Sequence, residues 1–251
     1  MSDIQRKERP IIFSGSSVRS ILADLKWATR RVMKHQPHED ASVTVENYNV
    51  TVVDRHGEQQ PGPEVFGAWW SDGEHGCVCP YGQPGDRLWV RESWWQAGDW
   101  QATYPEDDTG AWFGSKRIVY SADGTPPNEP NRHYPAGLRN GAYSAAEPNK
   151  IWRHRPSIHM PRAYSRILLE ITDVRVERLQ DISDEQALAE GIDQDALADA
   201  QDRYDMVADH NMTGRPTAVG AFRDLWAGIH GIDSWDANPM VWVVEFRRIQ
   251  P

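Results

Sequence analysis

The segment LKWATRR, from Leu25 to Arg31, is the stretch from which the fold and the chemistry of this chain are predicted. It places Lys26 and Thr29 three residues apart. A hydroxyl attacks a carbonyl only when a base accepts its proton, and a lysine acts as that base when its surroundings lower its pKa toward neutrality. The spacing alone is not specific, so the flanking segments decide what it means.

A short amphipathic helix is predicted directly before this segment, with Ser16 as its N-terminal cap. Apolar residues recur at i, i+3, i+4 and i+7 and form its inward face: Val18, Ile21, Leu22 and Leu25. If the last turn stays helical, Lys26 and Thr29 share one face. If the chain is already extended, the two side chains point to opposite sides, and only a bend joins them. The sequence leaves both alternatives open.

A second segment, GDRLWVRESWW at 85–95, supplies a carboxylate on a predicted strand that follows a Gln-Pro-Gly-Asp turn at 83–86. In an extended chain one face carries alternate residues: Leu88, Val90, Glu92 and Trp94. Glu92 therefore interrupts an apolar face. A carboxylate withdrawn from water tends to have a raised pKa, which suits acid or base catalysis, and Lys26 is its expected partner.

These two segments, together with a strand ending in PIIF at 10–13, resemble the ASCH domain family, and the longer stretches RPSIHMPRAYSRI and WVVEFRRI resemble its longer members. The resemblance implies an α+β fold, a PUA-like β-barrel with flanking helices and long inserted loops. It further implies that 1–251 form a single ASCH-like domain with insertions at about 96–150 and 192–216.

Small bacterial amidohydrolases within this family remove acyl groups from the exocyclic N4 of cytidine, using a lysine, a threonine three residues later and a distant strand glutamate. Matched by position, these residues are Lys26, Thr29 and Glu92. The resemblance implies that Thr29 attacks the acyl carbonyl, that Lys26 accepts its proton, and that Glu92 holds Lys26 or protonates the departing base. The substrate would be a small modified nucleoside, and the mechanism needs no metal and no organic cofactor. Residue chemistry alone favours a different interpretation, a structural salt bridge with Thr29 closing a helix end.

Candidate substrate-binding residues come from the aromatic and basic parts of the chain. The sequence has 12 tryptophans, whose flat faces can stack on bases or simply fill a core. Trp27, beside the candidate pair, and Trp94, on the face of Glu92, are the candidates for a base pocket. His159 and Arg162 in SIHMPR are candidate ligand contacts, although a histidine bonded to the backbone explains His159 equally well.

The motif HGCVC offers His75, Cys77 and Cys79 as partial zinc ligands, but without a second paired motif the cysteines are interpreted as small buried side chains. No metal site is therefore predicted.

Composition limits the classes of function. The net charge of −10 argues against a protein that coats long nucleic acid. Neither an apolar run of about 18 residues nor a signal peptide is found, so we expect a cytoplasmic protein without a membrane anchor, and the oligomeric state is not indicated. A basic stretch at 148–169, without acidic residues, supports the alternative function, a PUA-like RNA-binding module or a single-strand ribonuclease.

The remaining elements are predicted from periodicity. The segment 97–150 is expected to form long loops with one strand at 117–121. A strand at 165–176 shifts its apolar phase after Ile171, which predicts a bulge. Ser183 and Gln186 form a capping box, and Gly191 ends that helix.

Two more helices and a closing strand are predicted beyond Gly191. An acidic helix at about 193–210 should turn four residues inward: Leu197, Ala200, Tyr204 and Val207. A helix at 218–230 should pack through four others: Phe222, Leu225, Trp226 and Ile229. A strand at 241–246 should close the sheet.

Overall fold

The computed structural model describes residues 6–38, 40–70, 76–104, 109–127, 129, 151–208 and 213–249. The chain divides into two compact units. The first unit consists of Met1–Arg9, Ser20–Leu88 and Ile167–Pro251. The second unit consists of Pro10–Arg19 and Trp89–Arg166, so it contains the segment predicted as the first insertion.

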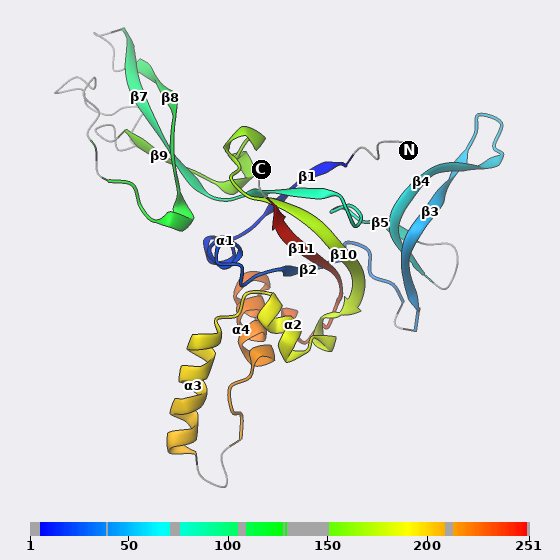
Figure 1. Cartoon of the computed structure of the whole chain (residues 1–251). Helices are drawn as coiled ribbons and strands as arrows, with labels where there is room; N and C mark the ends of the chain where they lie inside the picture. Colours follow the sequence, from blue (N-terminus) through cyan, green and yellow to red (C-terminus); the bar gives the residue numbers. More distant parts are fainter. Residues whose placement is uncertain are drawn as a thin grey trace. The chain divides into compact units, whose positions relative to one another are not determined.

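The fold is mixed α+β and consists mostly of sheets, as the sequence predicts (Figure 1). The largest sheet has five strands in the order β1-β6-β10-β11-β2. Their bounds are β1 Glu8–Ile12, β6 Arg87–Arg91, β10 Leu168–Arg178, β11 Met240–Ile249 and β2 Ala28–Val32. Within the described residues β1 and β2 are the two ends of this order, and no pairing between them closes the sheet into a barrel.

The antiparallel pair β10 and β11 contains the predicted bulge. Their register shifts between Ile171 and Asp173. Ile167, Leu169 and Ile171 are buried, and burial resumes at Val174, three residues further on instead of two. An extra residue in one strand restores the inward direction of the apolar side chains.

Helix α1, Gly15–Leu22, buries Val18 and Ile21 as predicted. Its cap differs from the prediction, because Ser14 rather than Ser16 accepts a hydrogen bond from the Ser17 N–H, at 3.3 Å. Leu25 lies beyond the end of the helix and is 52% exposed, so the predicted fourth inward position was wrong. The helix is one turn too short to carry it.

Helix α2, Asp184–Ala189, begins with the predicted capping box. The Ser183 side chain accepts from the Gln186 N–H, and the Gln186 side chain accepts from the Ser183 N–H. The chain turns after the helix at Gly191, which has a φ of 89°. Only glycine adopts this left-handed conformation without strain, which explains the predicted stop.

Two further helices, α3 (Gln194–Val207) and α4 (Ala218–His230), match their predicted positions but bury fewer residues than predicted. No residue of α3 is buried. In α4 only Phe222 and Trp226 of the predicted face are buried, whereas Leu225 and Ile229 are exposed. Phe222 and Trp226 are four residues apart and so lie on the same side of the helix, where they form the narrow apolar stripe through which α4 packs.

The buried face of α4 belongs to a core cluster of the first unit. Phe222 and Trp226 pack with Ala187 of α2, with Val241 and Val243 of β11, and with a few neighbours: Leu179, Ile182 and Ala218. In Figure 1 α2 and α4 lie side by side below the sheet edge that β2 forms. This cluster holds the residues that follow β10, including α2, against α4 and β11.

Each unit also has a three-stranded sheet. In the first unit the order is β3 (Val43–Val53), β4 (Gln59–Trp70), β5 (Gly76–Val78). In the second unit it is β8 (Thr109–Tyr120), β7 (Trp94–Tyr104), β9 (Trp152–Arg155). Short 3₁₀ helices complete the fold: Ser121–Asp123, Ser157–His159, Arg162–Tyr164, Leu179–Asp181 and Ile232–Ser234.

The prediction of long loops over 97–150 was therefore wrong for β7 and β8, which form an antiparallel hairpin. The glycines that suggested loops include Gly98 and Gly114, which face each other across this hairpin. A glycine in a strand often marks a close approach of another group, and the Trp112 ring lies where a side chain at Gly98 would be. Residues 130–150 lie outside the described part of the chain.

Among the described residues, no helix has both the length and the apolar character required to cross a bilayer.

Replacing Phe222 with Ala should lower the free energy of unfolding by about 3–5 kcal/mol, because it leaves a cavity in the core cluster. Ile229→Ala, on the exposed side of the same helix, should change it by no more than about 0.5 kcal/mol. Urea unfolding followed by circular dichroism measures both. Equal effects of the two substitutions would contradict the packing described for α4.

Candidate functional site

The segment that carries Lys26 is extended, which decides between the two alternatives left open by the sequence. Helix α1 ends at Leu22, and Asp24 adopts a φ of 56°, which breaks the helical path. Lys26 then forms an isolated antiparallel bridge with Glu190, and Trp27 donates its N–H to the Ala189 carbonyl. These bonds fasten the chain to the end of α2 just before β2 begins.

Lys26 is buried and makes an ion pair with a residue that the sequence analysis did not single out, Glu190. Its Nζ lies 2.6 Å from Glu190 Oε2 and 2.6 Å from the Glu190 carbonyl oxygen, to both of which it donates. Burial lowers the pKa of Lys26 from its ordinary value, the Glu190 carboxylate partly offsets that effect, and the nearby Arg31 and Arg30 add to the lowering. Lys26 is thus a base that gives up its proton more readily than an ordinary lysine.

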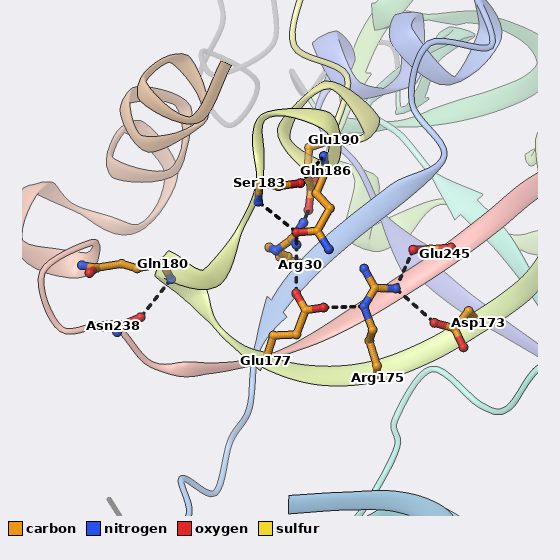
Figure 2. A network of polar contacts seen from close by, with 10 residues as sticks. All are labelled: Arg30, Asp173, Arg175, Glu177, Gln180, Ser183, Gln186, Glu190, Asn238 and Glu245. Atoms are coloured by element: carbon orange, nitrogen blue, oxygen red, sulfur yellow. Dashed lines mark hydrogen bonds and ion pairs between the residues drawn. The ribbon is translucent and has the colours of Figure 1, made fainter. Parts of the chain in front are cut away.

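Arg30 forms a second ion pair with Glu190, and the Arg30 side chain is fully buried. Its Nη1 lies 3.6 Å from Glu190 Oε1, too long for a hydrogen bond, and that oxygen is buried without a hydrogen-bond donor in the described structure. Its Nη2 donates to Glu177 Oε2 and to Gln186 Oε1, at 3.0 Å each. Figure 2 shows Arg30 between these groups.

The same network continues along the sheet through Arg175. Its guanidinium bonds Glu177, Asp173 at 3.0 Å, and Glu245 of β11 (Figure 2). Glu177 therefore joins the two arginines. Gln186 serves the network twice, because its Oε1 accepts both from Arg30 and from the Ser183 N–H of the capping box.

Thr29 is buried on β2 and pairs with Val244 of β11. Neighbouring residues of a strand point to opposite faces, so Thr29 lies on the face of β2 opposite to Arg30. Lys26 precedes the strand, and its ammonium group lies at Glu190. Because Arg30 also reaches Glu190, the Lys26 ammonium group lies toward the Arg30 face of β2, whereas the buried Thr29 side chain points to the other face.

Glu92 belongs to the second unit and lies between β6 and β7. The predicted alternation is confirmed, since Leu88, Val90, Glu92 and Trp94 are all buried and Glu92 is only 2% exposed. Burial raises the pKa of Glu92, and Arg166 partly offsets that increase. A carboxyl with these properties can carry a proton nearer to neutrality than an ordinary glutamate.

Arg166 makes a bidentate contact with Glu92, which the sequence analysis did not anticipate. Its Nε and Nη2 lie 2.9 and 3.1 Å from the two carboxylate oxygens. Asp123 binds the same guanidinium at 2.7 and 2.8 Å, and the Tyr120 ring lies 3.9 Å below it. A role for Glu92 beside Lys26 stays a prediction, because the two residues belong to different units.

The predicted substrate-binding residues also divide between the units. Trp27, in the first unit, is 44% exposed. In the second unit Trp94 is buried edge-to-face against Tyr164, His159 is exposed at the end of a 3₁₀ helix, and Arg162 is half-buried. Their roles stay predictions.

The cysteine motif shows no sign of reactive thiols. Cys77 lies on β5 and Cys79 is buried; burial raises the pKa of Cys77 to about 11 and raises that of Cys79 as well. His75 lies outside the described residues. Within the part of the chain that is described, no three His, Cys, Asp or Glu side chains gather closely enough to hold a metal ion.

No protein-family model matches the chain, and no curated protein or solved structure is significantly similar to it. The two partners that sequence reasoning missed each had a local signal. Glu190 follows a helix with a capping box directly before the Gly191 stop, and Arg166 precedes an apolar strand. Neither signal names the distant residue that each side chain meets.

Glu190→Ala should lower the free energy of unfolding by about 3–5 kcal/mol, because it leaves Lys26 buried without its carboxylate. The double substitution Lys26→Met with Glu190→Leu should recover most of that loss, since apolar side chains can replace a buried pair. Arg247→Ala serves as the control; the Arg247 side chain is 66% exposed in its pair with Glu170, so its removal should cost less than about 1 kcal/mol. Urea unfolding measures all four proteins. A double variant no more stable than Glu190→Ala would contradict this account.

Proposed function

We propose that this chain is an amidohydrolase that removes the acyl group from N4-acylated cytosine nucleosides. The observation that carries the proposal is a buried lysine of lowered pKa, Lys26, three residues before a buried threonine, Thr29. This is the residue pattern through which the chain resembles the cytidine-specific amidohydrolases of the ASCH family. Its further support is a second buried titratable group at the matching position, Glu92.

The proposed reaction begins when neutral Lys26 accepts the proton of the Thr29 hydroxyl through one bridging water molecule, because the two side chains lie toward opposite faces of β2. Thr29 Oγ then forms a bond to the acyl carbon, and the bond between that carbon and N4 breaks. The amine leaves with one proton, and a water molecule then hydrolyses the acyl ester, which regenerates the hydroxyl and releases a carboxylic acid. The proton gained by Lys26 is released to solvent, and Glu92 takes one up from solvent, so both groups return to their starting states. Lys26 can accept the Thr29 proton only if it is itself unprotonated near neutral pH. Burial favours this state because it lowers the pKa of Lys26.

Glu92 is proposed as the acid that delivers the proton to the departing base. An exocyclic amine leaves poorly as an anion, so a protonated carboxyl at this step lowers the barrier. The raised pKa of Glu92 supports this role, because it increases the fraction of the protonated form. The resemblance supplies the role itself.

Glu190 and Arg30 are proposed as positioning residues for Lys26. Glu190 accepts two hydrogen bonds from the lysine and so fixes its ammonium group. The positive charge of Arg30 lies 3.6 Å from the same carboxylate and partly neutralises it, so Glu190 stabilises the protonated form of Lys26 less strongly.

The fold proposed for this activity is an ASCH-like, PUA-like barrel elaborated around the five-stranded sheet. Its support is the order of elements along the chain. A strand, a helix and the Lys-x-x-Thr segment come first (β1, α1, β2), and the strand before Glu92 comes later (β6).

Purified protein should release cytidine from N4-acetylcytidine, and Thr29→Ala and Lys26→Ala should each lower kcat by at least about a hundredfold, the typical size of a lost nucleophile or base. Glu92→Gln should lower it by a similar factor. Liquid chromatography of the released cytidine measures the rate, and circular dichroism verifies that each variant is folded. Arg203→Ala, on the exposed surface of α3, is the control and should keep the wild-type rate. A folded wild-type protein inert toward acetyl, propionyl and benzoyl substrates would refute the proposal.

The pH dependence should respond to Glu190. The reaction needs neutral Lys26, so kcat/KM should fall on the acid side as the lysine becomes protonated. The Glu190 carboxylate raises the pKa of Lys26, so Glu190→Gln should move this acid limb to lower pH. Glu177→Gln is the control, because Glu177 bonds Arg30 and Arg175 and not Lys26. It should move the acid limb of the pH profile less than Glu190→Gln does. A shift of the limb to higher pH in Glu190→Gln would contradict Lys26 as the base.

A further inference from the structure

The two units differ sharply in charge. The residues of the second unit include 11 lysines and arginines and 8 acidic residues, a net charge of +3. The whole chain has 27 basic and 37 acidic residues, so the first unit carries the remaining 16 and 29, a net charge of −13. An overall charge of −10 therefore hides a positively charged unit. A surface of this sign attracts polyanions.

The positive charge is organised on the sheet of the second unit. Arg153 and Arg155 alternate on the edge strand β9, so they point to the same face. Their guanidinium carbons lie 4.6 and 5.1 Å from the centre of the Trp112 ring. One indole thus contacts two arginines.

Gly98 makes this arrangement possible. Trp112 lies on β8, on the far side of β7 from β9. Its ring occupies the space that a side chain at Gly98 of β7 would fill, and so reaches across the strand toward the two arginines. The arrangement crosses all three strands of the sheet, which makes it more specific than a chance pair of surface arginines.

A cation that rests on an aromatic ring has only part of its charge compensated by that ring. Within the described residues Arg155 has no ion-pair partner, and Trp112 is its contact. An anion with several oxygens beside the Arg155 guanidinium would complete that compensation and use its paired N–H donors. Phosphate groups have that geometry.

We propose that this face of the β7-β8-β9 sheet binds a short segment of single-stranded nucleic acid, with Arg153 and Arg155 on successive phosphates. Two arginines on one short edge strand match a few phosphates of a flexible strand rather than the many phosphates that a duplex presents. The inference is independent of the proposed hydrolase activity, because it uses none of the residues assigned to that reaction.

Fluorescence anisotropy with fluorescein-labelled oligomers of about 12 nucleotides, one of deoxythymidine and one of uridine, tests the proposal. The intact chain should bind at low salt and release the strand as salt rises. Arg153→Ala with Arg155→Ala should weaken binding at least about tenfold. It should also reduce the slope of log K against log salt by about 1.4, since each phosphate contact on a single strand contributes about 0.7.

The matched control removes two arginines from the helices of the first unit, Arg203→Ala with Arg223→Ala, and should leave the affinity unchanged. Trp112→Leu should weaken binding as well, because the guanidiniums lose the ring that orients them; thermal unfolding establishes that this variant is folded. The proposal would be overturned if the wild-type chain showed no saturable binding. It would also be overturned if the double variant Arg153→Ala with Arg155→Ala bound as tightly as the wild type. A duplex of the same length bound as tightly as the single strand would overturn the preference for single strands.

Discussion

The buried ion pair between Lys26 and Glu190 is the interaction on which the first unit depends. Removing two charges from water is costly, and the protein offsets that cost only by giving each charge several partners. Lys26 donates to a carboxylate and to a carbonyl of the same residue. Arg30 and Gln186 then hold the end of α2 against β2. The pair thus joins the segment before β2 to the residue that follows α2, 164 positions later in the chain.

The same pair creates the chemical character of Lys26. Burial disfavours the charged amine, whereas the Glu190 carboxylate favours it, and burial is the larger effect. A lysine poised in this way can exchange a proton that an exposed lysine would keep. Glu92 is governed by the same opposition, since burial raises its pKa and Arg166 lowers it. Both proposed catalytic groups therefore owe their properties to burial opposed by one ion-pair partner.

The charge of the chain is distributed rather than uniform. An acidic total argued against nucleic acid as a partner, but most of the acidic residues belong to one unit and a positive excess belongs to the other. The sheet of the second unit uses Gly98 to place Trp112 under two arginines. Whole-chain charge is consequently a poor guide to the ligands of a protein composed of two units.

Local patterns in the sequence determined the buried face of residues 88–94, the bulge after Ile171, the capping box of α2 and its stop at Gly191. Each follows from backbone geometry within a few residues, as does the α+β class. Tertiary structure alone decided that Lys26 meets Glu190, 164 residues away, and that Glu92 meets Arg166. It also decided that β7 and β8 pair as antiparallel strands where loops were predicted. Periodicity reveals which side of an element a residue occupies, but the partner on that side depends on how distant segments pack, and no local pattern encodes that choice.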